Sequence, residues 1–290
     1  MKPAAFDYVK PASVADAVAA LGAHEATILA GGQSLVPLMN LRLARPSLLV
    51  DVNGLFELDY VRSDSDHITV GALCRHRRLE FDPVVAEQVP LLAEAASLIG
   101  YPAIRNRGTL GGSVAHADPA AELGAALLAL GATVSVVGPR GPRRIEADDL
   151  FSGFFTTSLA TDELLVEVTV PSKQPGEGSA FVEFAPRRGD FAVVGIAARL
   201  TRDRAGKCSS VTVAGCGLAT TPVNLSNATD TLIGEKSLDD DHLRSIAARI
   251  GTAFEPTSDL QASGADRREL ASAVTVEALR RAWVHAGGGL

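Results

Sequence analysis

The sequence predicts an α+β protein of 290 residues with more than one domain. Short apolar runs alternate with helical patterns over the first 170 or so residues. The composition then changes to Lys, Gln, Pro, Gly and Glu across residues 172–178, which predicts a domain boundary there. Beyond this boundary the strand-like segments come first and the helical segments last, an order typical of an α+β domain.

The N-terminal part begins with a predicted helix. Ser13 and Asp16 form a capping-box pattern ahead of apolar residues at helical spacing, and Gly22 ends the segment. Three short apolar runs predict strands over residues 27–30, 48–52 and 67–71. The first of these strands is expected to be buried and to lead into a glycine pair. Residues 89–99 are rich in Ala and Leu and predict a buried helix that ends at Gly100.

The next segment predicts a helix over residues 120–130. Asp118 and Pro119 suit its N-cap and first helical position, and Gly131 closes it. A turn is expected at residues 139–142. The remaining elements are expected as strands over residues 132–138, 164–170, 180–185, 192–201 and 210–218, and as helices over residues 238–254 and 266–285.

Composition excludes several classes of function. The formal net charge is −7 and no basic stripe is visible, so a nucleic acid or an anionic membrane is not an expected partner. The cysteines, Cys74, Cys208 and Cys216, have no CxxC spacing, which argues against a disulfide framework and a cysteine-held iron–sulfur cluster. The N-terminus has no apolar signal region, and no apolar run reaches membrane-spanning length. We therefore expect a cytoplasmic protein.

Two glycine-rich segments, residues 30–34 and 109–113, are the most informative motifs. Each combines paired glycines with a hydroxyl residue, and glycine lets the backbone take positive φ and present N–H groups to an anion. Two such segments, about eighty residues apart, suggest a large dinucleotide held from two sides. The first segment lacks the three-glycine spacing of a Rossmann loop, and Pro37 restricts a following helix. Taken alone, it can also be a plain strand-to-helix connection.

The second segment has polar neighbours. The N–H groups of residues 111–113 are expected to donate to phosphate, and Thr109 adds a hydroxyl. Glu122 follows one helical turn after the predicted cap and can accept hydrogen bonds from ribityl or ribose hydroxyls. The alternatives are that Glu122 is a first-turn acid favoured by the helix dipole and that Asp118 is only an N-cap.

Other candidate groups are less specific. His116 suits a metal ligand or a general base, but no second histidine lies at ligand spacing, so no metal site is expected. Ser34 and Ser113 lack the G-x-S-x-G elbow of a hydrolase. Residues 184–192 predict either a charged hairpin tip or a segment that packs Phe191 near a planar cofactor ring.

In their order and spacing these segments resemble the FAD-binding medium subunit of molybdenum hydroxylases, a family that includes xanthine, carbon monoxide and nicotine dehydrogenases. The resemblance covers nearly the whole chain and rests on residues 6–11, 29–35, 107–113, 118–122, 163–171 and 188–192. It implies a PCMH-type FAD-binding domain over residues 1–173, with α/β subdomains of about 1–55 and 56–173. A C-terminal α+β domain, an antiparallel sheet plus helices, is expected over residues 178–290.

The resemblance also implies which residues bind FAD. In the family the two glycine segments hold the diphosphate from opposite sides, Ile99 and Ile104 match apolar positions that pack on the flavin, and Leu165 matches a backbone contact. The implied cofactor-binding residues are Leu29, Ala30, Gly31, Gly32, Gln33, Ser34, Leu35, Val36, Ile99, Ile104, Thr109, Gly111, Gly112, Ser113, His116, Glu122, Leu165 and Phe191. Glu183 departs from the pattern, because some members have lysine there, and Gln33 replaces a His or Asn.

The implied function is that of an FAD-carrying subunit in a heterotrimer, assembled as a dimer of heterotrimers. A large subunit carries molybdopterin, a small subunit carries two [2Fe–2S] clusters, and electrons pass from these clusters through FAD to an external acceptor. No residue of this chain is expected to be catalytic, since the cofactor supplies the redox chemistry. The alternatives are a self-sufficient flavin reductase or oxidase and a non-catalytic assembly or binding protein.

Overall fold

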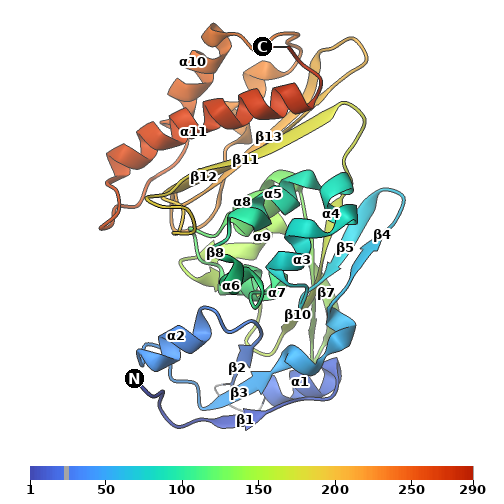
Figure 1. Ribbon diagram of the computed structural model, residues 1–290, viewed down its shortest axis with the longest axis vertical. Helices are drawn as coiled ribbons and strands as arrows, with labels where there is room; N and C mark the ends of the chain where they lie inside the picture. Colours follow the sequence, from blue (N-terminus) through green and yellow to red (C-terminus); the bar gives the residue numbers. More distant parts are fainter. Residues whose placement is uncertain (23–25, 290) are drawn as a thin grey trace.

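The computed structural model describes residues 1–22 and 26–289, and its first sheet has three parallel strands (Figure 1). Their order is β1 (Asp7–Val9), β3 (Leu48–Asp51) and β2 (Ala26–Leu29). Helix α1 (Val14–Leu21) begins as expected, because the Ser13 hydroxyl accepts from the Asp16 N–H at 3.1 Å. Strand β2 was expected to be buried, but it is half-buried because it lies at an edge of this small sheet.

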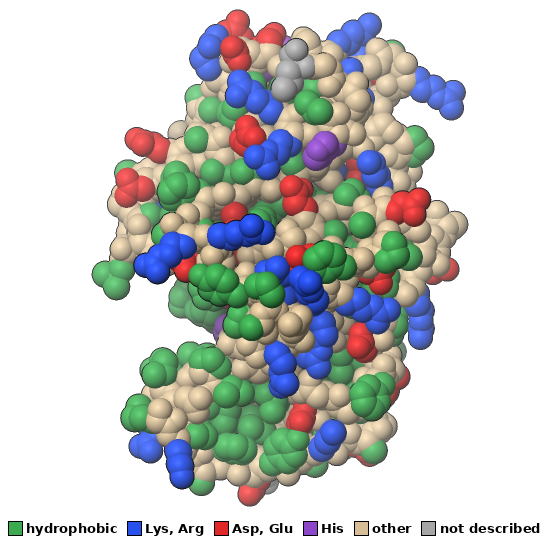
Figure 2. All heavy atoms as spheres, in the orientation of Figure 1, with side chains coloured by type: hydrophobic (Ala, Val, Ile, Leu, Met, Phe, Trp, Pro, Cys, Tyr) green, Lys and Arg blue, Asp and Glu red, His purple; other side chains and the backbone are tan. Residues whose placement is uncertain are grey.

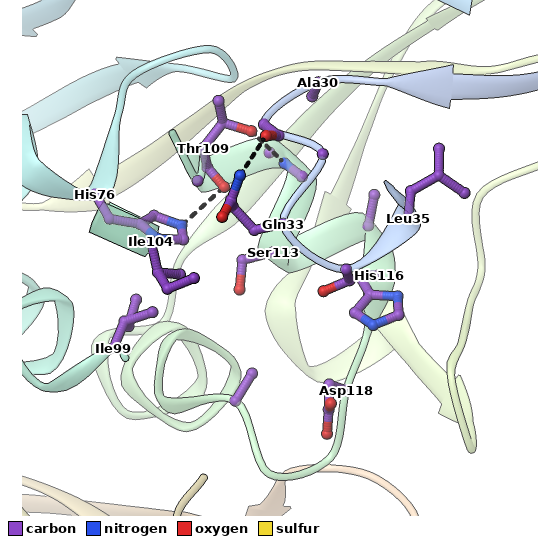
Figure 3. A pocket seen from close by; sticks show the side chains of 18 of the residues that line it. Ala30, Gln33, Leu35, His76, Ile99, Ile104, Thr109, Ser113, His116 and Asp118 are labelled. Carbon is purple, nitrogen blue, oxygen red and sulfur yellow. Dashed lines mark hydrogen bonds between the residues drawn. The ribbon is translucent and has the colours of Figure 1, made fainter. Parts of the chain in front are cut away.

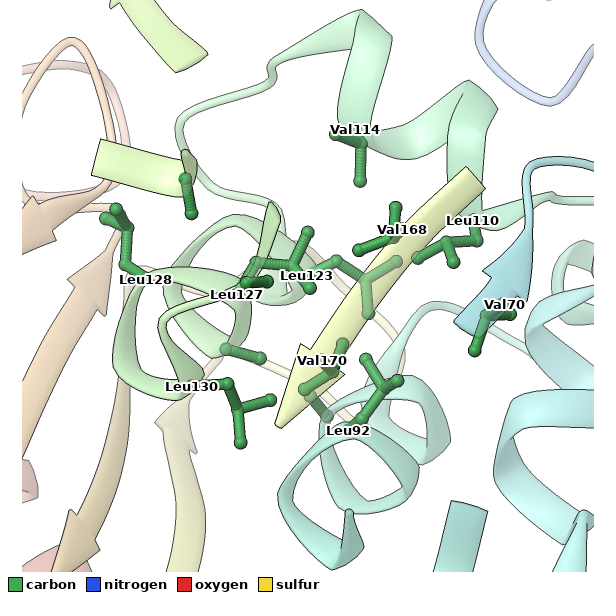
Figure 4. Close-up of a cluster of buried hydrophobic side chains, with 14 of the residues drawn as sticks. Val70, Leu92, Leu110, Val114, Leu123, Leu127, Leu128, Leu130, Val168 and Val170 are labelled. Carbon is green, nitrogen blue, oxygen red and sulfur yellow. The ribbon is translucent and has the colours of Figure 1, made fainter. Parts of the chain in front are cut away.

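The second sheet has five antiparallel strands and carries the largest core. Their order is β4 (Val61–Ser63), β5 (His67–Gly71), β10 (Leu164–Pro171), β6 (Thr133–Gly138) and β7 (Gly141–Glu146). The helices around it are α3 (His76–Phe81), α4 (Pro83–Gln88), α5 (Pro90–Leu98), α7 (Leu110–His116) and α8 (Glu122–Leu130). Figure 4 shows Val168 and Val170 of the central strand among leucines of α5 and α8. Full burial of each such side chain stabilises the fold by about 1.5–3 kcal/mol.

The third sheet is sandwiched between two sets of helices. Its strand order is β11 (Glu177–Phe184), β12 (Val194–Arg202), β13 (Cys208–Cys216) and β14 (Val223–Asn224). Helix α11 (Gly264–His285) lies across one face, with α10 (Asp240–Ile250) beside it, and α5 and α8 pack against the opposite face (Figure 1). The predicted α+β class, with strands first and helices last in this part, is confirmed.

Two local predictions are wrong, and one strand beside them was not predicted. Asp118 does not cap a helix; its carboxylate accepts from the Ala120 N–H at 2.9 Å in a turn, and α8 begins at Glu122. Residues 109–113 are not an open loop, because Thr109 caps α7, which starts at the next residue. No strand was predicted after the turn at residues 139–142, where the chain continues the hairpin as β7.

Many short elements were not predicted from the sequence. Besides β1, β4, β14, α3 and α4, they include α2 (Leu35–Asn40), α6 (Pro102–Arg105), α9 (Ala147–Leu150), β8 (Phe151–Gly153), β9 (Thr156–Thr157) and the 3-10 turns at Val52–Gly54, Phe56–Leu58, Ser226–Ala228 and Asp230–Leu232. Helix α2 tolerates Pro37 because the proline lies in its first turn, where the backbone N–H needs no helical acceptor. None of the helices in residues 1–22 and 26–289 is long and apolar enough to cross a membrane.

Candidate cofactor site

A cavity of about 620 Å³ lies between the first sheet and the rest of the molecule. Figure 2 shows the surface hollowed beside the lowest lobe, with hydrophobic side chains gathered on that lobe. A cavity of this size with a mostly apolar wall and few polar groups is typical of a cofactor site. The expected residues that line it are Ala30, Gly31, Gly32, Gln33, Ser34, Leu35, Ile99, Ile104, Thr109, Gly111, Gly112, Ser113, His116, Glu122, Leu165 and Phe191.

Leu29 and Val36, the other two expected residues, do not line the cavity. They flank Gly32, which has a φ of +71°, and a Cβ on Gly32 would lie 3.2 Å from a side-chain carbon of each. They therefore support the conformation of the first glycine segment from the side that faces away from the cavity.

The first glycine segment presents free hydrogen-bond donors. The backbone N–H groups of Gly32, Gln33 and Ser34 have no acceptor among the residues that the structure describes, and neither has the Ser34 hydroxyl. The Gln33 side chain donates to the Gly31 carbonyl at 3.1 Å and so braces the loop internally (Figure 3). Consecutive unpaired N–H groups in such a loop form a concavity suited to an anion.

The second glycine segment is different, because its N–H groups are already bonded. Gly111 donates to the Ala72 carbonyl at 2.8 Å, Gly112 to the Thr109 hydroxyl at 3.1 Å, and Ser113 to the Thr109 carbonyl at 3.0 Å. The prediction that these three groups are free to hold phosphate is therefore wrong for this conformation. The glycines serve close packing, since a Cβ on Gly111 would lie 2.7 Å from the Ala72 Cβ. The Ser113 hydroxyl remains free among the described residues and lines the cavity.

We expect Thr109→Val to lower the free energy of unfolding by about 1 kcal/mol, because valine keeps the shape but removes the oxygen that caps α7. Denaturant unfolding of the variant beside the wild type measures this difference. An unchanged free energy would show that another group takes over the Gly112 N–H.

The first glycine segment touches the residues that come directly before the second one. A Cβ on Gly31 would lie 2.5 Å from the Arg107 carbonyl oxygen and 2.8 Å from the Gly108 Cα. The sequence predicted that the two segments face one another across a ligand. The structure brings them together at the base of the cavity, and only glycine permits this approach.

Two residues that sequence reasoning missed join the segments. The Asn53 amide donates to the Ala30 carbonyl at 2.7 Å and to the Leu29 carbonyl at 3.3 Å. The Arg75 guanidinium donates to the Asn53 amide oxygen at 2.9 Å and to the Arg107 carbonyl. The only sequence signal was the basic run at residues 75–78, which composition alone could not connect to the glycine segments.

His76 holds the start of the second segment through a side-chain hydrogen bond to the segment's backbone. Its side chain is buried, and burial lowers its pKa to about 4, so the ring is neutral at pH 7. Its Nε2 lies 2.9 Å from the Thr109 carbonyl oxygen and therefore carries the proton and donates (Figure 3). Its Nδ1 is tightly packed, since a Cβ on Gly108 would lie 2.7 Å away.

The opposite side of the cavity is acidic. Glu122 is the first residue of α8 and is 5% exposed. Burial, together with the nearby carboxylates of Glu183 and Asp118, raises its pKa to about 8, so its carboxyl is protonated at pH 7 and can donate a hydrogen bond. The rings of His116 and Phe155 pack at a tilt of 46°, with their centroids 4.9 Å apart. The described residues contain no cluster of His, Cys, Asp and Glu that could hold a metal ion.

An apolar wall completes the cavity. Ile99 and Ile104 lie close together in Figure 3, and Phe191 is 58% exposed beside the cavity. The buried Arg105 fixes this wall, because it donates to the Ile99 carbonyl at 3.1 Å and pairs with Glu80 at 2.8 Å. The isoleucines are thus held by a buried ion pair as well as by packing.

Comparison with known proteins identifies the family. The sequence matches the family model of the FAD-binding domain in molybdopterin dehydrogenase over residues 4–173. The chain belongs to the FAD-binding medium subunits of the molybdenum hydroxylases. Residues 179–282 match the C-terminal domain of the CO dehydrogenase flavoprotein. This membership makes the chain an oxidoreductase subunit of FAD-binding type.

Individual relatives of this FAD-binding subunit cover its whole length. The chain is 40% identical to 6-hydroxypseudooxynicotine dehydrogenase complex subunit alpha of Paenarthrobacter nicotinovorans, over 97% of this chain and 96% of that protein. Carbon monoxide dehydrogenase of Hydrogenophaga pseudoflava superposes with a TM-score of 0.94 at 35% identity, over 98% and 99% of the two chains. Quinoline 2-oxidoreductase of Pseudomonas putida 86 gives 0.93 at 36% identity, over 99% of both.

The residues of this FAD-binding subunit fit the cofactor of its family. The unpaired N–H groups after β2 suit a diphosphate, and the apolar wall suits a planar ring. The protonated Glu122 and the free Ser113 hydroxyl can bond to the polar atoms of a sugar alcohol or a ring. The cavity thus offers suitable groups for a diphosphate, a planar ring and a sugar alcohol.

Proposed function

We propose that this chain holds FAD in the cavity between the two glycine segments, as the medium subunit of a heterotrimeric molybdenum-dependent hydroxylase or dehydrogenase. The observation that carries the proposal is the contact of Gly31 with residues 107–108, which brings both segments of the family motif to one cavity. The partners are a large subunit with molybdopterin and a small subunit with [2Fe–2S] clusters, in a cytoplasmic dimer of heterotrimers. The relatives named as subunits of dehydrogenase complexes support the presence of partner subunits.

The proposal divides the chain at two points. Residues 1–173 form the FAD-binding domain, with subdomains of about 1–55 and 56–173, and residues 178–290 form the C-terminal domain. The limits of the two family matches and the separate sheets support this division.

We assign a distinct task to each part of the cavity. The first glycine segment binds the diphosphate through its N–H groups, and Ile99, Ile104 and Leu165 exclude water from the ring. Glu122 holds a proton at its carboxyl within the cavity, and Phe191 covers the opening. FAD, when bound, supplies electron transfer from the iron–sulfur clusters to an external acceptor. The protein's contribution is binding, orientation and the exclusion of water.

The test is the flavin content of the complex purified with its partner subunits. We expect FAD, released by denaturation and identified by its absorbance and its chromatographic retention, in a one-to-one ratio with this chain. A complex without FAD would overturn the proposal and favour an assembly protein. Rapid flavin reduction by a small substrate in the isolated chain would favour a self-sufficient flavin enzyme instead.

A further inference from the structure

Asn53 and Arg75 together link the two glycine segments from outside the cavity lining. Asn53 follows β3 of the first sheet, and Arg75 follows β5 of the second. We call this pair the latch. Because its members come from different sheets, the latch ties the two walls of the cavity to each other.

The latch acts on backbone carbonyl groups. It binds the carbonyl oxygens of Leu29 and Ala30 at the start of the first segment and of Arg107, two residues before the second. In a trans peptide the C=O and the following N–H point in opposite directions. Holding the Ala30 carbonyl therefore fixes the direction of the Gly31 N–H, directly before the unpaired N–H groups of residues 32–34.

Asn53 is itself held in one orientation. Asp51 accepts from the backbone N–H of Asn53 at 3.0 Å and from its side-chain NH₂ at 2.7 Å. This arrangement turns the amide oxygen toward Arg75, which donates to it at 2.9 Å. The amide thus has acceptors on one side and a charged donor on the other, so its orientation is fully determined.

Arg75 is partly buried. This burial and, to a smaller extent, the positive charge of the nearby Arg107 lower the pKa of its guanidinium. Hydrogen bonds to a charged donor are worth about 1.5–3 kcal/mol. Removing this guanidinium would leave the Arg107 carbonyl and the Asn53 amide oxygen without their donor.

We propose that Asn53 and Arg75 are positioning residues that set the first glycine segment in the conformation that receives the diphosphate of FAD. The inference rests on the proposed function, since it assumes that the cavity holds FAD. The latch lowers the cost of binding because the loop is ordered before the cofactor arrives. Its loss is expected to accelerate the release of FAD without unfolding the domain.

The test compares Asn53→Ala, Arg75→Ala and the double variant in the complete complex. FAD release after dilution is followed by the rise in flavin fluorescence. We expect each single variant to release FAD about 10-fold to 100-fold faster. The double variant should release FAD at about the rate of the faster-releasing single variant, because both changes break one linked unit. Arg75→Lys keeps one charged donor and should fall between Arg75→Ala and the wild type.

Arg78→Ala is the matched control. Arg75 is the N-cap residue of helix α3, and Arg78 lies within the same helix. Arg78 pairs with Asp59 and Asp82 and bonds to neither glycine segment. Its FAD release should stay within about 2-fold of the wild type, because exposed ion pairs contribute little. The thermal midpoint of each FAD-free complex separates positioning from general stability.

The outcomes are distinct. Faster release at an unchanged FAD-free midpoint, with non-additive single effects, supports the latch. Wild-type release rates in the variants overturn it and leave the proposed function standing. A parallel loss of FAD-free stability with additive effects also overturns it, since Asn53 and Arg75 would then be structural only. A wild-type complex that lacks FAD overturns the proposed function and the latch with it.

Discussion

Replacing Gly31 with valine is expected to weaken FAD binding at least about 100-fold, which corresponds to about 3 kcal/mol. The reason is the contact between the segments: a Cβ would lie 2.5 Å from the Arg107 carbonyl oxygen and 2.8 Å from the Gly108 Cα. Both neighbours are backbone atoms that cannot rotate away, so the two segments must separate. Overpacking of this kind costs about 1–3 kcal/mol before any loss of ligand contacts. The FAD content of the purified complex measures the effect.

Gly22→Ala is the control for this substitution. Gly22 ends α1 with a φ of −71°, and a Cβ there would meet its nearest atom at an ordinary 3.7 Å. This variant should retain a full complement of FAD. Full retention in Gly31→Val as well would contradict our interpretation, because it would show that the segments part without harm to the site.

The sequence was most informative where a local signal determines local structure. The Ser13 cap, Gly131 at the end of α8 and the alternating pattern of β10 each correspond to an element of the structure. Asp118 misled because an Asp-Pro pair suits a turn as well as a helix start, and the choice depends on the contacts of residues 119–121. Glycine pairs are also ambiguous, since the same residues permit an open loop in one segment and close helix packing in the other.

The latch could not be predicted because tertiary structure alone brings its members together. Asn53 and Arg75 follow strands of different sheets, and neither belongs to a motif. The burial of Glu122 was hidden for a similar reason. Its place at the start of a helix is consistent with an exposed first-turn acid, but the third sheet packs on α8 and removes the carboxyl from water.

Glu122→Gln is expected to stabilise the protein at alkaline pH. Burial raises the folded-state pKa of Glu122 to about 8, above its usual value of 4.5. The folded state therefore binds a proton that the unfolded state releases, and stability falls as the pH rises from about 4.5 to about 8. Integrated over this window, the loss is about 4 kcal/mol. Glutamine has no proton to lose, so the variant should match the wild type near pH 4.5 and exceed its unfolding free energy by about 4 kcal/mol at pH 8.

Denaturant unfolding from pH 5 to pH 9 measures this difference, with Glu269→Gln as the exposed control that should leave the pH profile unchanged. Glu183 contributes in the same direction, because burial raises its pKa to about 7, so Glu183→Gln should remove a further part of the slope. A wild-type profile as flat as that of Glu122→Gln would show that Glu122 is ionised in the folded state.

A carboxyl that lowers stability at neutral pH and lines the cavity is typical of a group that serves a ligand. Weaker FAD binding by the more stable Glu122→Gln variant would therefore separate that role from any contribution to folding.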